Sequence, residues 1–123
     1  MATLNDRVFD NGLTVLDTEA SKILVTSLES TTYTEANATH ALGNSTSLSI
    51  GAPADRSGGG REVTVAAISD GSITATGTAT HYAIVDVTNT RLLVTGALSA
   101  SQSVTSGNTF TVASFAIGIP DPS

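Results

Sequence analysis

The sequence predicts one mainly β domain, residues 1–123, built as a small β-sandwich, a jelly-roll-like fold or a β-barrel with one or two short helices in its N-terminal third. Three observations lead to this prediction. Apolar and polar residues alternate with a period of two in the second half of the chain. Polar turn signals separate the alternating segments at regular spacing. Ser and Thr supply most of the polar surface, because charged residues make up 13% of the chain, against about 25% in an average domain.

The N-terminal segment, residues 1–21, carries two conflicting signals. Apolar residues such as Leu13 and Leu16 recur at three- and four-residue steps, which predicts a short helix over Asp10–Glu19. The dipeptide Asn11-Gly12 is instead typical of a tight hairpin turn. Both alternatives stay open, and in either case the segment is a candidate for contact with a partner. A strand over Lys22–Ser27 follows.

A second short helix is expected near Tyr33–Ala38. Thr32 followed by Glu35 matches a capping box, in which the two residues satisfy backbone groups at a helix start. Gly43 is a residue that can end such a helix in the left-handed conformation. Ser47–Ile50 then alternates briefly and predicts a strand.

The second half of the chain predicts longer strands. Glu62–Ile68 predicts a strand, and Asp70-Gly71 predicts a hairpin turn after it. Alternation then continues from Ile73 to Val87, which would span about 50 Å if it were fully extended. That length exceeds a domain of this size, so a bend or bulge is expected near Gly77.

The remaining elements are short and regularly spaced. Asn89 marks a turn, Leu92–Leu98 a strand, and Ser106–Asn108 another turn. Thr109–Ile119 is expected to close the domain as a final strand. Pro120–Ser123 is expected to leave it as an extended tail.

A glycine-rich loop at residues 51–60 raises the question of a nucleotide site. A phosphate-binding loop needs a lysine after its last glycine, and none follows here. The dinucleotide fingerprint has Val63 in place of its third glycine and leads into a strand rather than a helix. We therefore interpret the loop as a flexible connection, with a remaining role as a partner-binding element. Its candidate contact residues are Arg56, Gly58, Gly59, Gly60 and Arg61.

Composition excludes several other functions. The net charge is −6 with a single lysine, so the clustered cations that nucleic-acid binding needs are missing. There is no cysteine, and the two histidines, His40 and His81, do not form a metal-binding pair. We predict no catalytic residue, no cofactor, no metal and no enzyme activity. We also predict no membrane contact, and a soluble protein made in the host cytoplasm.

A face rich in threonine is the most unusual surface in the predicted sheet. Thr74, Thr76 and Thr78 alternate with small residues along one predicted strand. Alternating hydroxyls offer cross-strand hydrogen bonds. One interpretation is an exposed threonine face above a core of small residues, and the other is an interface between subunits. We keep these three residues as candidate partner contacts.

Several segments of the sequence resemble small structural proteins of tailed bacteriophages. These segments are Thr32–Ala36, Leu42-Gly43, Gly58–Ile68, Ile73–Asp86 and Leu98–Val112. The resemblance implies a virion component, and most specifically a capsid decoration, or cement, protein. Such proteins are compact all-β domains, often trimers, that bind the major capsid protein and stabilise the head. A neck, tail or fibre subunit is the alternative, followed by a small sugar-binding or hydrolase module of the virion.

Overall fold

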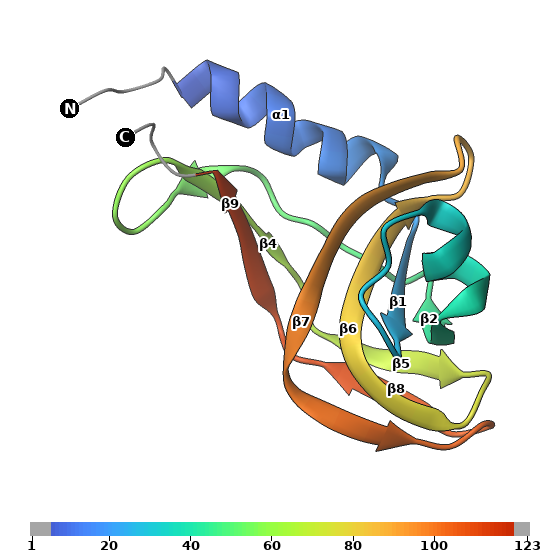
Figure 1. Ribbon diagram of the computed structural model, residues 1–123. Coiled ribbons are helices and arrows are strands. Elements are labelled where there is room, and N and C mark those ends of the chain that lie inside the picture. The colour runs from blue at the N-terminus through green and yellow to red at the C-terminus, as the bar shows by residue number, and fades with distance from the viewer. Residues whose placement is uncertain (1–5, 120–123) are drawn as a thin grey trace. The chain divides into compact units, whose positions relative to one another are not determined.

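The computed structural model describes residues 6–119 and shows a mainly β protein (Figure 1). Strands make up 52% of the chain and helices 15%, and the strands form antiparallel sheets. The predicted fold class is therefore confirmed. The backbone divides into two compact units, and the chain crosses from one to the other four times. The predicted tail, residues 120–123, and the first five residues of the predicted contact segment lie outside the described range.

The first unit holds the residues up to Glu19, then Ser49–Ala67 and the residues from Ala113 onward. Its secondary structure is one helix and a three-stranded sheet of order β3-β4-β9. The elements are α1 (Asp6–Glu19), β3 (Ala54–Asp55), β4 (Arg61–Val65) and β9 (Phe115–Ile119).

Helix α1 packs on β4 through a narrow apolar stripe. Leu13 and Leu16 are buried on the helix, and Val63 and Val65 are buried on the strand. Alternate residues of a strand share one face, so the two valines present a single apolar surface to the unit's core. Of the two alternatives for the N-terminal segment, the helix is confirmed and the hairpin is wrong.

The second unit, Ala20–Leu48 with Ile68–Val112, holds a six-stranded sheet of order β7-β6-β1-β2-β5-β8. A short π-helix, η1, packs against β1, β2 and β6. The elements are β1 (Lys22–Thr26), η1 (Glu35–Thr39), β2 (Ala41–Ser45), β5 (Ile68–Ile73), β6 (Gly77–Asp86), β7 (Arg91–Val104) and β8 (Thr109–Val112).

The helix η1 packs on part of one face of this sheet, over β1, β2 and β6. Leu24, Ala83 and Val85 form a buried cluster with Ala36 of η1, and Tyr33 packs at its margin. The residues beneath the helix at β6 are small or β-branched, which lets the helix approach the sheet closely. The predicted helix near Tyr33–Ala38 and the predicted strand Lys22–Ser27 supply Ala36 and Leu24 to this cluster.

Several predicted boundaries agree with the structure. The strand at Lys22–Ser27 is β1, and the predicted bend near Gly77 is the break between β5 and β6. The turns predicted at Asn89 and at Ser106–Asn108 are present, the second with Gly107 at a φ of +92°. Strand β7 starts near the predicted Leu92 and runs six residues beyond Leu98, to Val104.

Two glycine-based predictions are wrong. Gly43 does not end a helix but lies buried in the middle of β2, opposite Ile73 of β5. Gly71 does not form a hairpin turn but pairs with Phe110 of β8 within β5. A Cβ at Gly43 would meet the carbonyl oxygen of Ser72 and the side chain of Ile73 on β5, and a Cβ at Gly71 would meet the ring of Phe110 on β8. Short dipeptide signals cannot reveal such a non-local cause.

Three strand predictions need smaller corrections. Ser47–Ile50 is not a strand, and only Ile50 makes an isolated bridge, to Val65. The predicted strand Glu62–Ile68 ends at Val65, and Ile68 already belongs to β5. The predicted final strand Thr109–Ile119 is interrupted at residues 113–114. Both interruptions fall where the chain crosses between the two units, and small residues occupy them.

Candidate functional site

The glycine-rich loop is the turn of a hairpin that joins β3 to β4. Ala54 pairs with Glu62 and Asp55 with Arg61, so the loop closes from Arg56 to Gly60. The amide of Arg56 donates to the carbonyl of Gly60 at 3.1 Å, and the amide of Gly59 donates to the carbonyl of Arg56 at 3.1 Å. The sequence prediction that this loop leads into a strand is confirmed.

Three consecutive residues of this loop have a left-handed backbone. The φ angles of Gly58, Gly59 and Gly60 are +89°, +105° and +92°. Residues with a Cβ atom rarely adopt such angles, so the turn requires glycine at these positions. The glycines therefore shape the turn of a hairpin, and this explains them without a bound phosphate.

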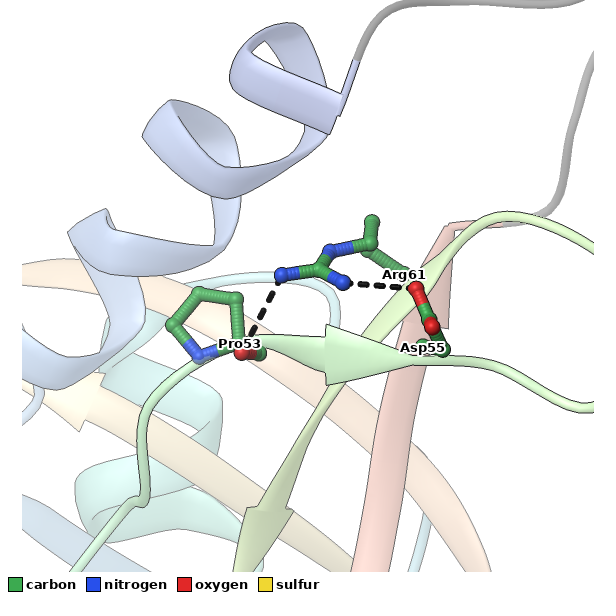
Figure 2. A network of polar contacts seen from close by, with 3 residues as sticks. All are labelled: Pro53, Asp55 and Arg61. Carbon is green, nitrogen blue, oxygen red and sulfur yellow. Dashed lines mark hydrogen bonds and ion pairs between the residues drawn. The ribbon is translucent and has the colours of Figure 1, made fainter.

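Arg61 holds the base of the hairpin. Its Nη1 donates to Asp55 Oδ1 at 2.7 Å and its Nη2 donates to the carbonyl of Pro53 at 3.3 Å (Figure 2). The side chain of Arg61 is 17% exposed and that of Asp55 is 90% exposed. The carboxylate is therefore the solvent-exposed half of this ion pair.

Arg56 is also engaged within the first unit. Its Nη1 donates to the carbonyl of Gly59 at 3.0 Å. Its side chain lies over Gly118 of β9, since a Cβ built on that glycine would stand 2.9 Å from Arg56 Cδ. Both arginines predicted to contact a partner are thus used to support the loop, and each keeps a partly exposed side chain.

The predicted threonine face is not one face of one strand. Thr74 and Thr76 lie in the link between β5 and β6, and Thr78 lies in β6. Thr74 Oγ1 donates to the carbonyl of Leu42 at 3.4 Å, and Thr76 Oγ1 accepts from the amide of Ser106 at 3.0 Å. The link turns the chain because the amides of Thr74 and Ala75 both donate to the same Leu42 carbonyl. All three threonines are nevertheless exposed.

The candidate residues fall into two sets. Arg56 to Arg61 belong to the first unit, and the three threonines belong to the second. Each set is therefore considered as a surface of its own unit.

Both histidines lie near the end of β1, and both bind hydroxyl groups. Thr26 pairs with His81 on β6 and with Ala41, the residue after His40, on β2. Ser30 Oγ is 3.3 Å from His40 Nδ1, and Thr80 Oγ1 is 2.9 Å from His81 Nδ1. Within residues 6–119, no group of three or more acidic, histidine or cysteine side chains is arranged to hold a metal ion.

Three carboxylates have a structural role that the sequence analysis missed. Glu35 Oε1 accepts from the amide and the hydroxyl of Thr31, both at 2.8 Å, and these bonds lower its pKa. Asp70 accepts from the hydroxyls of Ser47 and Ser45, which lower its pKa in that order of effect. The motif Thr32 to Glu35 was recognised, and Thr32 Oγ1 does accept from the amide of Glu35 at 3.1 Å.

Asp86 is the third of these carboxylates. It is buried at the end of β6 and accepts from the side-chain amide of Asn89 at 2.7 Å and from its backbone amide at 3.3 Å. The side-chain bond from Asn89 is the main reason that the pKa of Asp86 is lowered. An Asp three residues before an Asn in a turn is the local signal that would have found this contact.

The single lysine joins η1 to the sheet. Lys22 Nζ, at the start of β1, donates to Asn37 Oδ1 of η1 at 2.8 Å. The pair is partly buried beside the cluster beneath η1. This contact spans fifteen residues, and no spacing rule predicts it from the sequence.

Comparison with known proteins gives no relative. No protein-family model matches the chain, and no curated protein or solved structure shows significant similarity to it. Every helix in the described part of the chain is too short or too polar to cross a membrane.

Proposed function

We propose that this chain is a non-enzymatic structural protein of a tailed-phage particle. Its most specific role would be capsid decoration, in which copies bind the outer face of the major capsid protein lattice and stabilise the head. The resemblance of five sequence segments to phage structural proteins supports this role. The surface of the second unit supports it independently, as follows.

The observation that carries the proposal is that the exposed residues between Ser69 and Thr111 include many hydroxyls and few charges. From Ser69 to Thr111 the exposed charged residues are Asp70 and Arg91, because Asp86 is buried. Hydroxyl side chains occupy much of the rest of this exposed surface. They include Ser69, Ser72, Thr74, Thr76, Thr78, Ser101, Ser103, Thr105, Thr109 and Thr111.

Such a surface suits a shallow contact with another protein. Hydroxyls exchange hydrogen bonds with water for hydrogen bonds with a partner at small cost, whereas a charge loses more when it is removed from water. The net charge of −6 keeps copies apart in solution at the concentrations that decoration of a whole shell requires. A trimer, which the resemblance implies, belongs to this proposal.

The test is to mix the purified protein with empty, expanded heads of the phage that encodes it. We expect saturable binding with a fixed number of copies per head, measured by co-sedimentation and electron microscopy. Thr78→Lys places a charge on the exposed hydroxyl surface and should weaken binding at least ten-fold. Thr64→Lys, which places the same charge on β4 of the first unit, serves as the matched control.

The outcomes separate the proposed function from its alternative. Binding to heads that does not saturate, or no binding at all, would contradict capsid decoration. If the protein instead assembles on purified tails, it is a neck, tail or fibre subunit.

A further inference from the structure

The edges of the two described sheets differ in how they are protected. An edge strand presents unpaired N–H and C=O groups, which proteins usually protect by short length, charge or bulges. Strand β3 has only two residues, one of them Asp55. Strand β7 has two register shifts along β6, and β8 has four residues and one register shift along β5.

Strand β9, Phe115–Ile119, has none of these protections among the residues that the structure describes. It pairs with β4 in one unbroken register, from Arg61 with Ile119 to Val65 with Phe115. It contains no charged residue and no proline, and β4 is its only described partner strand. Ile119, at the end of this uncharged edge, is 37% exposed.

We propose that β9 pairs antiparallel with β9 of a second copy of this chain, centred on Ile117. This two-fold arrangement places Phe115 opposite Ile119 of the second copy, and Ala116 opposite its Gly118. The two three-stranded sheets then form one continuous sheet across the two-fold axis. The inference does not depend on the proposed function in a phage particle.

The residues of β9 complement themselves in this register. Phe115 opposite Ile119 is an aromatic and β-branched pair, the kind that stabilises neighbouring strands. On the other face, Ala116 and Gly118 are both small and exposed, so they leave room for Arg56, which lies over Gly118. The pairing brings no like charges directly opposite each other.

Charge favours a second copy over a charged partner. The chain carries a net charge of −6, so copies repel each other over most of their surface. Strand β9 is uncharged, so repulsion is least where this edge meets its own copy. A cationic or acidic partner strand would find no opposite charge along β9 itself.

The size of the contact sets its strength. A five-residue strand buries less than the roughly 1,200–2,000 Å² of a stable interface. We therefore expect a weak dimer that forms as the protein concentration rises. Each copy has one β9, so the pairing joins copies two at a time and doubles the mass of a monomer.

Sedimentation equilibrium of the full chain over a wide concentration range tests the proposal. The wild-type chain should show the doubling step. Ala116→Lys should weaken that step at least ten-fold, because the lysine would stand beside Arg56 of the second copy. Ala116→Glu should keep the step within about three-fold of wild type, because its carboxylate would face the same arginine.

Thr64→Lys is the matched control. Thr64 is exposed on the same face of the sheet, but it lies on β4, one strand away from the edge. It should leave the doubling step unchanged, and circular dichroism should show that all variants fold. A wild-type chain of constant mass at every concentration would overturn the proposal, as would an unchanged doubling step in Ala116→Lys.

Discussion

Glycine serves two different purposes in the two units of this protein. In the hairpin of the first unit, Gly58–Gly60 supply left-handed backbone angles for a tight turn. In the six-stranded sheet of the second unit, Gly71 and Gly96 have ordinary strand conformations and face the large rings of their partners, Phe110 and Tyr82. The first purpose is conformational and local. The second is a matter of space, and it depends on residues far away in the sequence.

Cross-strand pairing of a glycine with a large side chain explains much of the second unit. The ring of Tyr82 covers Gly96, and the Cβ that Gly96 lacks would lie 2.6 Å from Cε1 of that ring. Burial against this strand raises the pKa of Tyr82. Aromatic side chains that cover strand glycines shield the exposed backbone and fix the register of the two strands.

The largest loss of stability should come from placing a side chain at one of these strand glycines. A Cβ at Gly71 would lie 2.3 Å from Phe110 Cε1, and Phe110 is only 4% exposed, so its ring has little room to move. We expect Gly71→Ala to lower the free energy of unfolding by about 2–3 kcal/mol. Urea unfolding followed by far-UV circular dichroism, which reports the secondary structure of both units, measures the loss.

Gly51→Ala is the control for this prediction. Gly51 lies in the first unit, has no left-handed angle, and its Cβ would meet only Thr64 O at an ordinary 3.8 Å. It should change the free energy of unfolding by less than about 0.5 kcal/mol. Equal losses for the two variants would show that Gly71 is not kept free of a side chain by Phe110.

A smaller loss of stability is expected from a substitution in the β3–β4 hairpin, where only the backbone conformation of the glycine matters. Gly59 has a φ of +105°, so Gly59→Ala strains the backbone by about 1–3 kcal/mol. Gly59→Asn should lose less than Gly59→Ala, because asparagine tolerates left-handed angles better. Thermal unfolding by circular dichroism ranks the two, and the reverse ranking would contradict a conformational cause.

A third glycine should respond in the opposite direction. Gly12 lies in α1, is exposed, and has room for a Cβ at 3.7 Å from Ile119 Cδ1. Alanine favours a helix over glycine by about 1 kcal/mol, so Gly12→Ala should stabilise the protein by that amount. An increase in the melting temperature checks this. A decrease would show that α1 packs more tightly over β9 than the structure indicates.

The sequence predicted the elements whose causes are local. The helix at the N-terminus, the strand β1, the break near Gly77 and the turn at Gly107 all follow from periodicity or turn residues nearby. The failed predictions at Gly43 and Gly71 have non-local causes, because the backbone of Ser72 and the side chain of Ile73 approach Gly43 from β5, and Phe110 approaches Gly71 from β8. A single sequence gives no information about which strands are neighbours.

The residues of the candidate site show the same contrast between local causes, which the sequence reveals, and non-local causes, which it does not. The failure of the nucleotide motifs at Gly58–Gly60 could be seen from residue identity alone. The engagement of Arg61 with Asp55 and Pro53 could not, because it depends on how β3 folds back on β4. The threonine face was overestimated because alternation continued through Thr74–Thr76, where the chain leaves one strand and enters another.

Low pH should destabilise the second unit, and this effect should be smallest near neutral pH. Among the residues that the structure describes, the carboxylates of Glu35, Asp70 and Asp86 have lowered pKa values, and these three lie in the second unit. A lowered pKa means that the folded state binds the proton more weakly than the unfolded state does. The stabilisation is therefore complete above the ordinary carboxyl pKa of about 4 and is lost as the pH falls through the folded-state values below it.

Tyrosine fluorescence follows the second unit selectively, because the chain has no tryptophan and both Tyr33 and Tyr82 lie there. We expect its melting temperature to stay constant from about pH 7 to 5 and to fall below about pH 4. Glu35→Gln removes the carboxylate that binds Thr31, so it should lower the melting temperature at neutral pH and reduce the fall in acid. A fall of the same size in wild type and Glu35→Gln would assign the acid sensitivity to Asp70 and Asp86. A melting temperature that does not change in acid would show that these carboxylates do not stabilise the folded sheet.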